Sequence, residues 1–393
     1  MKIVIVGAGQ AAASMAARLR AKGHTGPLTL IGEEPLPPYQ RPPLSKAYLL
    51  GDMGLDRLIL RSDDWWRDEG IDLQTDTQAT AIDAAARQVL TDRGSVDYDV
   101  LALTTGAYTR RLPAAMGGDL AGVHVIRTLG DVDRLQPALA AARRVIVLGG
   151  GYVGLEGAAV ARKLGKDVTL IEASPRILGR VASAETADML RARHVAHGVT
   201  ILEGTAISAI SGDEAATGVD LLDGEHLPAD LILCGIGALP RIDLAETAAL
   251  ELDNGIAVDA FGRTSDAAIW SAGDCASFPT SRGRLRLESV GNAIDMAEAV
   301  ADNILGADTP YRANPWFWSD QYDAKLQIAG WNAGYDRVVT RGNSVWYFHG
   351  DTLLAVDALN DPRAYMVGKR LIEAGRSPDP DAVASAPDLK ALM

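Results

Sequence analysis

The sequence is poor in cysteine, with only Cys234 and Cys275 among 393 residues. Two thiols this far apart build neither a CxxC redox pair nor a zinc site of four thiolates. Long hydrophobic runs are also missing, because no stretch reaches the about 18 apolar residues of a membrane-spanning helix. Gly7 and Gly9 interrupt the N-terminal apolar segment, which favours a strand and turn over a signal peptide. We expect a cytoplasmic protein.

Basic residues are in the minority, with 38 Lys and Arg against 51 Asp and Glu, for a net charge of −13. An acidic surface repels nucleic-acid phosphates and anionic lipids, so the composition predicts neither nucleic-acid nor membrane partners. Metal-ligand clusters are scarce as well. His194 and His197 fall on one face of a predicted helix, but no third ligand accompanies them. We predict a surface helix there and no metal site.

What the sequence does have is glycine at two special places. The first follows a predicted buried strand at residues 2–6 and reads Gly7-Ala8-Gly9-Gln10-Ala11-Ala12. This is the GxGxxA form of the dinucleotide fingerprint, in which glycines allow a tight turn and close approach of a pyrophosphate to a helix N-terminus. Glu33 ends the next predicted strand, at roughly the spacing of about 20 residues expected for an acid that binds a ribose.

The second copy is Gly149-Gly150-Gly151-Tyr152-Val153-Gly154, directly after a predicted strand at 144–148. Glu172 ends the following strand at the same kind of spacing. A carboxylate there accepts hydrogen bonds from the 2′-hydroxyl of NAD and repels the 2′-phosphate of NADP, so NAD is favoured. Arg176 and Arg180 follow closely and would soften that preference. Two dinucleotide sites in one chain are explained most simply by FAD in the first and NADH in the second.

From Trp316 onward, the hydrophobic pattern alternates as in an antiparallel sheet and ends in a predicted helix. The sequence therefore predicts an α/β protein with two Rossmann-like dinucleotide-binding domains and a C-terminal α+β domain containing an antiparallel sheet. The predicted FAD-binding domain is discontinuous, comprising residues 1–109 and 240–315. The predicted NAD-binding domain covers 110–239, and the C-terminal domain covers 316–393.

Further segments narrow the class of protein: 38–46, 104–107, 235–240, 272–274, 287–293 and 315–322. With the two fingerprints, they resemble the FAD-dependent pyridine-nucleotide reductases that serve ferredoxin, putidaredoxin and rubredoxin. The resemblance spans nearly the whole chain and implies a glutathione-reductase-like arrangement of domains. One departure is Arg241, where that family usually has asparagine. By itself, the Pro-rich segment 38–46 would also suit a polyproline spacer.

The resemblance implies a set of site residues. Lys46 would lie near the flavin ring, Glu156 would pair with it, and Trp318 would lie at the flavin's edge toward an iron–sulfur partner. A solvated ion pair and a core tryptophan are the alternatives for these three. The implied FAD-binding residues are Gly7, Gly9, Ala11, Glu33, Arg41, Lys46, Ala79, Thr105, Gly106, Arg127, Gly273, Asp274 and Val290. The implied NAD-binding residues are Gly149, Gly151, Gly154, Glu172, Gly235 and Gly237.

The implied activity is that of an NADH-dependent ferredoxin reductase. Hydride passes from NADH to FAD, and single electrons then pass to a [2Fe–2S] ferredoxin that serves a cytochrome P450 or a Rieske oxygenase. A reductase with a small-molecule or rubredoxin acceptor is one alternative. An NADH-binding interaction protein resembling apoptosis-inducing factor is another. Because ferredoxins are usually acidic, docking would need a local basic patch. Its candidates are Arg282, Arg284, Arg286, Arg341 and Arg363.

Overall fold

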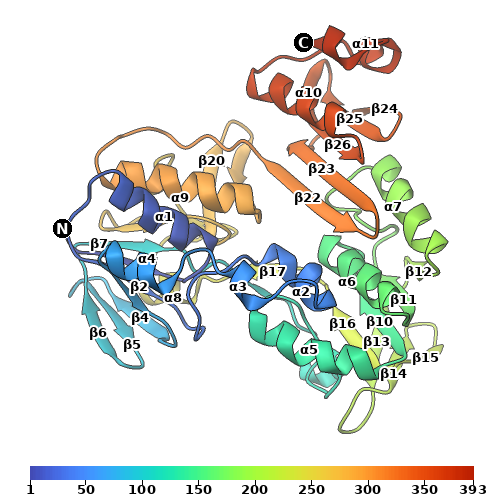
Figure 1. Cartoon of the computed structure of the whole chain (residues 1–393), viewed down its shortest axis with the longest axis horizontal. Coiled ribbons are helices and arrows are strands. Elements are labelled where there is room, and N and C mark those ends of the chain that lie inside the picture. Colours follow the sequence, from blue (N-terminus) through green and yellow to red (C-terminus); the bar gives the residue numbers. More distant parts are fainter. The chain divides into compact units, whose positions relative to one another are not determined.

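The structure is a computed structural model that describes residues 1–393, and the chain divides into two compact units (Figure 1). Unit 1 comprises residues 1–40, 55–108 and 239–315, and unit 2 comprises 41–54, 109–238 and 316–393. The short strands β8 (Ala107–Thr109) and β17 (Ala238–Pro240) lie where the chain passes from one unit to the other. None of the helices is both long enough and apolar enough to cross a membrane.

Unit 1 is built around a five-stranded parallel sheet with the order β19–β7–β1–β2–β3. All four residues of β1 are buried, as expected for a central strand covered on both faces. The strands are β1 (Ile3–Val6), β2 (Leu28–Ile31), β3 (Ile71–Gln74), β7 (Val100–Leu103) and β19 (Ile269–Ser271).

Helices α1 (Gln10–Ala21) and α9 (Val290–Ile304) run side by side in unit 1 (Figure 1). Arg18 of α1 joins them, because its guanidinium donates to both carboxylate oxygens of Asp302 at 2.8 and 2.6 Å. The remaining elements are α3 (Leu55–Leu58), α4 (Asp63–Asp68), β4 (Ala79–Asp83), β5 (Gln88–Thr91), β6 (Gly94–Asp97), α8 (Asp243–Thr247), β18 (Ile256–Ala257), β20 (Ala276–Thr280) and β21 (Gly283–Leu285).

Unit 2 contains a second parallel sheet, with the order β12–β11–β10–β16–β9. Helix α6 (Tyr152–Lys163) follows β10 and packs on this sheet. The strands are β9 (Val123–His124), β10 (Arg144–Leu148), β11 (Asp167–Glu172), β12 (Thr200–Glu203) and β16 (Leu231–Cys234). The other elements here are η1 (Pro42–Ser45), α2 (Ala47–Leu50), η2 (Ala114–Met116), α5 (Leu129–Ala141), α7 (Ala184–Ala196), β13 (Ile207–Ser211), β14 (Gly218–Leu221) and β15 (His226–Pro228).

The C-terminal part of unit 2 is an antiparallel sheet with the order β22–β23–β26–β25–β24. Trp346, Phe348 and Val356 of this sheet form a core with Val367 of helix α10. The elements are β22 (Trp316–Gln321), β23 (Ala324–Gly330), β24 (Arg337–Arg341), β25 (Ser344–His349), β26 (Thr352–Leu359), α10 (Pro362–Glu373), α11 (Pro380–Ser385) and η3 (Leu389–Leu392).

The two five-stranded parallel sheets and the five-stranded antiparallel sheet of the C-terminal part confirm the predicted fold class. The division into two units does not reproduce the predicted domains one for one. Residues 41–54 group with unit 2, and residues 316–393 fall in the same unit as 109–238. The three-domain boundaries therefore remain a prediction.

Candidate active site

The first glycine turn has the geometry that a dinucleotide fingerprint requires. Gly7 has a φ of +107°, and a Cβ added there would collide with the carbonyl oxygen of Thr104. Gly9 precedes the first turn of α1, and a Cβ at Gly9 would meet no atom within 4 Å. A close turn beside an open, positively polarised helix end fits the pyrophosphate of a dinucleotide.

Glu33, the acid expected to bind the ribose, is held by a side chain of the same unit. Arg241 donates through its two terminal guanidinium nitrogens to the two carboxylate oxygens of Glu33, with Nη2 at 2.8 Å from Oε2. The backbone of Arg241 is fixed as well, because its N–H donates to Gly106 at 3.0 Å and its carbonyl accepts from Oγ1 of Thr105 at 2.7 Å. The structure thus joins Glu33, Thr105 and Gly106 through the residue in which this chain departs from the family pattern.

The structure brings some of the other predicted FAD-binding residues of unit 1 together, but not all of them. A Cβ at Gly273, which follows β19, would lie 3.1 Å from the Cβ of Ala11 in α1. The carbonyl of the next residue, Asp274, accepts from Arg286 at 3.0 Å. Val290 begins α9. Ala79 begins β4, outside the parallel sheet.

The remaining predicted FAD-binding residues belong to unit 2. Arg41 donates to the backbone carbonyl of Arg127 at 2.8 Å, so the structure brings these two together. Residues 42–45 form the short helix η1, with Lys46 following it. A folded 3₁₀ turn tied to its own unit argues against a free polyproline spacer.

Lys46 and Glu156 form a buried ion pair. The Nζ of Lys46 lies 2.8 Å from Oε2 of Glu156, and their side chains are 17% and 3% exposed. Lys46 also donates to the carbonyl of Pro42 at 3.3 Å. The hydroxyl of Ser45 donates to Oε2 of Glu156, and that of Ser319 donates to Oε1 at 2.6 Å. The low exposure of both side chains excludes a solvated surface pair. The ion pair and the hydrogen bonds compensate for the cost of burying the charge of Glu156.

The second glycine turn repeats the geometry of the first. Gly149 has a φ of +100°, and a Cβ there would lie 2.5 Å from the carbonyl oxygen of Gly235. A Cβ at Gly154 would collide with the carbonyl of Gly149, whereas one at Gly151 would meet nothing within 4 Å. Gly237 has a φ of +108° and lies beyond the end of β16. These predicted NAD-binding glycines converge at the carboxyl ends of β10 and β16.

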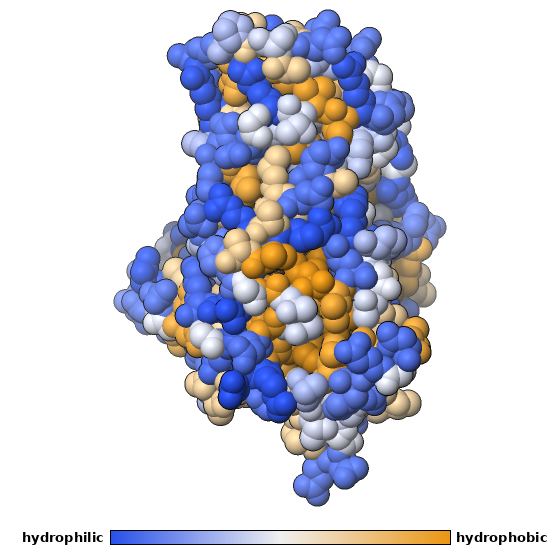
Figure 2. All heavy atoms as spheres, turned by 90° about the vertical axis from the view of Figure 1, so that its right-hand side faces the viewer, coloured by the Kyte–Doolittle hydropathy of each residue, from blue (hydrophilic) through white to orange (hydrophobic).

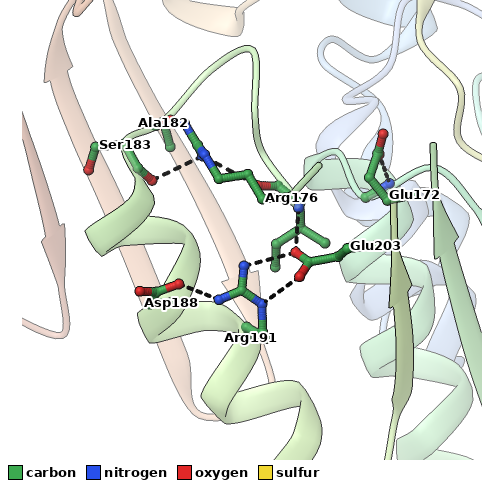
Figure 3. A network of polar contacts seen from close by, with 9 residues as sticks. Glu172, Arg176, Ala182, Ser183, Asp188, Arg191 and Glu203 are labelled. Atoms are coloured by element: carbon green, nitrogen blue, oxygen red, sulfur yellow. Dashed lines mark hydrogen bonds and ion pairs between the residues drawn. The ribbon is translucent and has the colours of Figure 1, made fainter. Parts of the chain in front are cut away.

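Glu172 supports the loop that follows β11 (Figure 3). Its Oε2 accepts from the N–H of Gly150 and its Oε1 from the N–H of Ser174, both at 2.7 Å. Arg176 donates to the carbonyls of Ala182 at 2.7 Å and Ser183 at 3.2 Å. Because Arg176 is used inside its own loop, it is not placed to attract a 2′-phosphate. Arg180 is exposed.

Glu203 of β12, which is held by Arg191 of helix α7, makes a second contact with this loop (Figure 3). Glu203 accepts from the N–H of Ile177 at 2.7 Å, and Arg191 of α7 donates to the same carboxylate at 3.0 and 2.8 Å. The loop that carries the predicted ribose-binding acid is therefore fixed from both sides.

Strand β22 presents two different faces. Phe317 and Ser319 face α6, since the ring of Phe317 lies 4.8 Å from that of Tyr152 and Ser319 bonds to Glu156. Trp318 therefore points to the other face, where it stacks on Trp316 at 5.6 Å and remains partly exposed. A buried core position for Trp318 is excluded.

Several arginines of the predicted basic patch form hydrogen bonds or ion pairs with other groups of the chain. Arg284 donates to the carbonyls of Val258 and Ser277, Arg341 to the carbonyl of Val383, and Arg363 to Asp388. Figure 2 shows a face on which hydrophobic residues gather in the middle of the view with hydrophilic residues around them.

Sequence reasoning missed several polar residues around Glu156. Ser45, Ser319 and Gln321 fall within the segments that carry the family resemblance, but that resemblance gave none of them a role. The surface position predicted for His194 is wrong: the residue is fully buried and bonds to Gln321. The signal was the pattern of β22, in which Ser319 and Gln321 alternate with Trp318 and Asp320 and so share the buried face. The sequence showed Arg241 only as a departure from the asparagine that is usual in the family, and its ion pair with Glu33 was not predicted.

The site is thus that of a protein with two dinucleotide folds and a buried lysine–glutamate pair. Residues 1–297 match the family described as pyridine nucleotide-disulphide oxidoreductase, and residues 316–393 match the reductase C-terminal family. The chain belongs to the pyridine nucleotide-disulphide oxidoreductase family.

Similar proteins match over nearly the full length. Rhodocoxin reductase of Rhodococcus erythropolis is 42% identical, with 99% of this chain and 94% of the relative covered. Putidaredoxin reductase CamA of Pseudomonas putida is 40% identical, with 94% and 91% covered. The structure of a covalent putidaredoxin reductase–putidaredoxin complex has a TM-score of 0.95 and 38% identity, covering 100% of this chain and 97% of that one. The ferredoxin reductase for the CYP199A2 system of Rhodopseudomonas palustris has a TM-score of 0.96 and 36% identity, covering 100% of both chains.

These comparisons confirm the predicted family, the class of enzyme and the cofactors. The chain is a flavoprotein oxidoreductase that uses FAD and NAD(P)H. No cluster of three or more His, Cys, Asp or Glu residues is arranged to hold a metal ion. Both cysteines are buried, and burial raises the pKa of the Cys234 thiol to about 11, so that thiol is a poor nucleophile.

Proposed function

We propose that this chain is an NADH-dependent ferredoxin reductase that feeds a cytochrome P450 or Rieske oxygenase through a [2Fe–2S] ferredoxin. The observation that carries the proposal is the whole-length likeness, in sequence and fold, to reductases named for putidaredoxin, rhodocoxin and ferredoxin. The likeness extends over the C-terminal sheet, which contains Trp318.

The residues of each unit fit the group assigned to them. Gly7, Gly9 and the N-terminus of α1 would hold the FAD pyrophosphate, and Glu33 would face its ribose. Gly149, Gly151 and Glu172 would do the same for NADH. The open space at Gly9 and at Gly151 supports this assignment. We also propose three domains, supported by the separate family match of residues 316–393.

When bound, FAD supplies a hydride acceptor that can release electrons one at a time. The chain contributes position and charge. Lys46 holds a positive charge fixed by Glu156, and a fixed cation stabilises negative charge that develops nearby. Trp318 presents a flat aromatic surface at the partly exposed face of β22.

NADH rather than NADPH is the proposed donor. Glu172 points its carboxylate into the loop after β11, and Arg176 is turned toward the carbonyls of Ala182 and Ser183. A 2′-phosphate would meet the negative charge of Glu172, and Arg176 is not free to pair with it, whereas Arg180 of the same loop is exposed. A cytoplasmic location belongs to the same proposal, because NADH and reduced ferredoxins are used there and both cysteines are free thiols.

The test is an anaerobic titration of the purified protein with NADH and then NADPH, following the flavin absorption band. We expect bleaching at about one NADH per flavin, a much weaker response to NADPH, and rapid electron transfer to [2Fe–2S] ferredoxins. A flavin that NADH does not bleach would contradict the reductase assignment. Bleaching followed by turnover only with rubredoxin or a small-molecule acceptor would contradict the proposed partner.

A further inference from the structure

A continuous line of hydrogen bonds runs through unit 2 and ends at the Lys46–Glu156 pair. The hydroxyl of Tyr322 lies 3.2 Å from Nδ1 of His194, and Nε2 of His194 lies 2.8 Å from Oε1 of Gln321. The Nε2 of Gln321 donates to Oγ of Ser319 at 3.0 Å. Ser319 in turn donates to Oε1 of Glu156 at 2.6 Å.

The chemistry of the end groups gives this line one direction. Glu156 is paired with Lys46 as a carboxylate, which only accepts, so Ser319 must donate to it. Ser319 then accepts from the amide nitrogen of Gln321, and the carbonyl oxygen of Gln321 accepts from His194. His194 is therefore the Nε2–H tautomer, and its Nδ1 accepts from Tyr322. Every donor points toward Glu156, an arrangement in which successive hydrogen bonds strengthen one another.

The residues of the line are enclosed in the protein. His194, Ser319, Gln321 and Glu156 are 0%, 1%, 2% and 3% exposed. Burial holds the pKa of His194 below its ordinary value, which favours the neutral ring. Buried groups that have no alternative partners in water keep their orientation, so the line fixes the position of each member.

Three elements meet through these contacts: α6 carries Glu156, β22 carries Ser319 and Gln321, and α7 carries His194. Lys46 has no other carboxylate partner in the structure and bonds otherwise to the carbonyl of Pro42. The direction of its Nζ therefore depends on where Oε2 of Glu156 points, and Ser319 holds the other oxygen of that carboxylate.

We propose that Ser319, Gln321 and His194 are positioning residues for the reductase reaction, aiming Lys46 through the carboxylate of Glu156. This inference rests on the proposed function, in which Lys46 lies beside the flavin. It adds a role for three buried residues that act on Lys46 through the carboxylate of Glu156.

The first experiment measures the tautomer of His194 in the otherwise unchanged protein. Histidine labelled with ¹⁵N gives separate signals for the six histidines of the chain, and H194Q identifies the signal of His194. We expect His194 to remain the neutral Nε2–H tautomer between about pH 6 and 8, although an ordinary histidine titrates near 6.5. An Nδ1–H tautomer, or titration of His194 in that range, would overturn the proposal.

The second experiment compares variants of the FAD-loaded protein, each checked for flavin content and thermal stability. We expect S319A to slow NADH-driven flavin reduction by about tenfold and H194L by a few-fold, because small misplacement of a reacting group is costly. The flavin midpoint potential should fall in both, since a displaced Lys46 stabilises the reduced flavin less. H194Q retains a donor toward Gln321 and should recover most of the rate.

H197A is the matched control. The ring of His197 stacks on Tyr322 at 3.7 Å, and its one hydrogen bond is to the carbonyl of Arg193, so the side chain lies beside the line without joining it. We expect its rate and potential to equal those of the unchanged protein. Equal rates and potentials in S319A and H194L, with E156Q slowed, would overturn the inference alone. Unchanged behaviour of both E156Q and K46M would instead refute the proposed role of the pair.

Discussion

The two glycine turns of this chain are nearly identical in backbone geometry but differ in what holds the acid behind them. Gly7 and Gly149 have φ values of +107° and +100°, and both pack against a backbone carbonyl at the end of a neighbouring strand. Glu33, however, is held by the side chain of Arg241, whereas Glu172 is held by backbone N–H groups. The same fold thus fixes one acid by an ion pair and the other by its own loop.

This difference predicts how strongly a substitution at or near each of the two acids should affect the protein. An ion pair between groups that are 34% and 40% exposed contributes little to stability and weakens with salt. Two backbone donors cannot be removed by substituting another side chain. We therefore expect changes near Glu33 to act mildly and changes at Glu172 to disturb a whole loop.

The largest effect should come from breaking each turn in a separate variant. G7V and G149V place a β-branched residue at a positive φ and against a backbone carbonyl, which the turn cannot accommodate. We expect G7V to be purified without flavin. G149V should retain flavin that dithionite reduces, yet lose NADH-driven reduction by at least about a hundredfold. Loss of flavin from G149V, with G7V unaffected, would reverse the assignment of the two units.

A second comparison between the units uses pH. In unit 2, burial raises the pKa of Asp357 to about 6, and its Oδ2 accepts from Thr186 at 2.8 Å. A raised carboxyl pKa means that the folded state binds the proton more tightly, so stability from this group falls as pH rises from about 4 to 6. D357N should remove that loss, which amounts to about 3 kcal/mol at 1.36 kcal/mol per pKa unit.

The counterpart in unit 1 has the opposite sign. Arg18 holds the pKa of Asp302 below its ordinary value, so this pair stabilises the fold at neutral pH and is lost in acid. Urea unfolding of D357N, D302N and the unchanged protein at several pH values measures both. The advantage of D357N over the unchanged protein should grow from pH 4 to 6, whereas the disadvantage of D302N should be constant above about pH 4 and shrink as the pH falls below it. Parallel curves would contradict the two pKa shifts.

At the second acid, E172Q should weaken NADH use more than any single change at Glu33. Glutamine retains one acceptor oxygen but loses the charge and one of the two backbone contacts. We expect the KM for NADH to rise about tenfold and the preference over NADPH to narrow. Stopped-flow reduction of the flavin with each nucleotide checks this. An unchanged preference would show that Glu172 only supports the loop.

The smallest effect is expected at the first acid. R241N restores the residue usual in the family and removes the ion pair to Glu33, but it leaves the backbone contacts to Thr105 and Gly106. We expect FAD to dissociate a few-fold faster, with the difference shrinking at high salt. Release of FAD is followed by flavin fluorescence. Slower release would mean that Arg241 competes with the ribose for Glu33.

The fold class and the two dinucleotide-binding turns could be predicted from the sequence, because their signals are local. Gly7 and Gly149 indicate the turns by residue type alone, and Glu33 and Glu172 follow them at a regular spacing. Lys46 and Glu156 came from family resemblance, since no local pattern joins residues so far apart in the chain. The burial of His194 was not predicted because a polar residue on a helix is expected to be exposed. Only the fold shows that strand β22 covers this side of α7. The alternation in β22 holds that information, but only the fold shows what it faces.

Both compact units are assembled from separated stretches of chain. The parallel sheet of unit 1 is completed by β19, and α1 packs on α9, which ends at Ile304. During synthesis on the ribosome, residues 1–108 therefore cannot complete their sheet and helix layer until β19 and α9 have been made. Contacts between such distant segments are slow to form and leave apolar edges exposed meanwhile. Neither unit can be obtained by cutting the gene at a single point, so fragments meant to isolate one cofactor site need two or more joined segments.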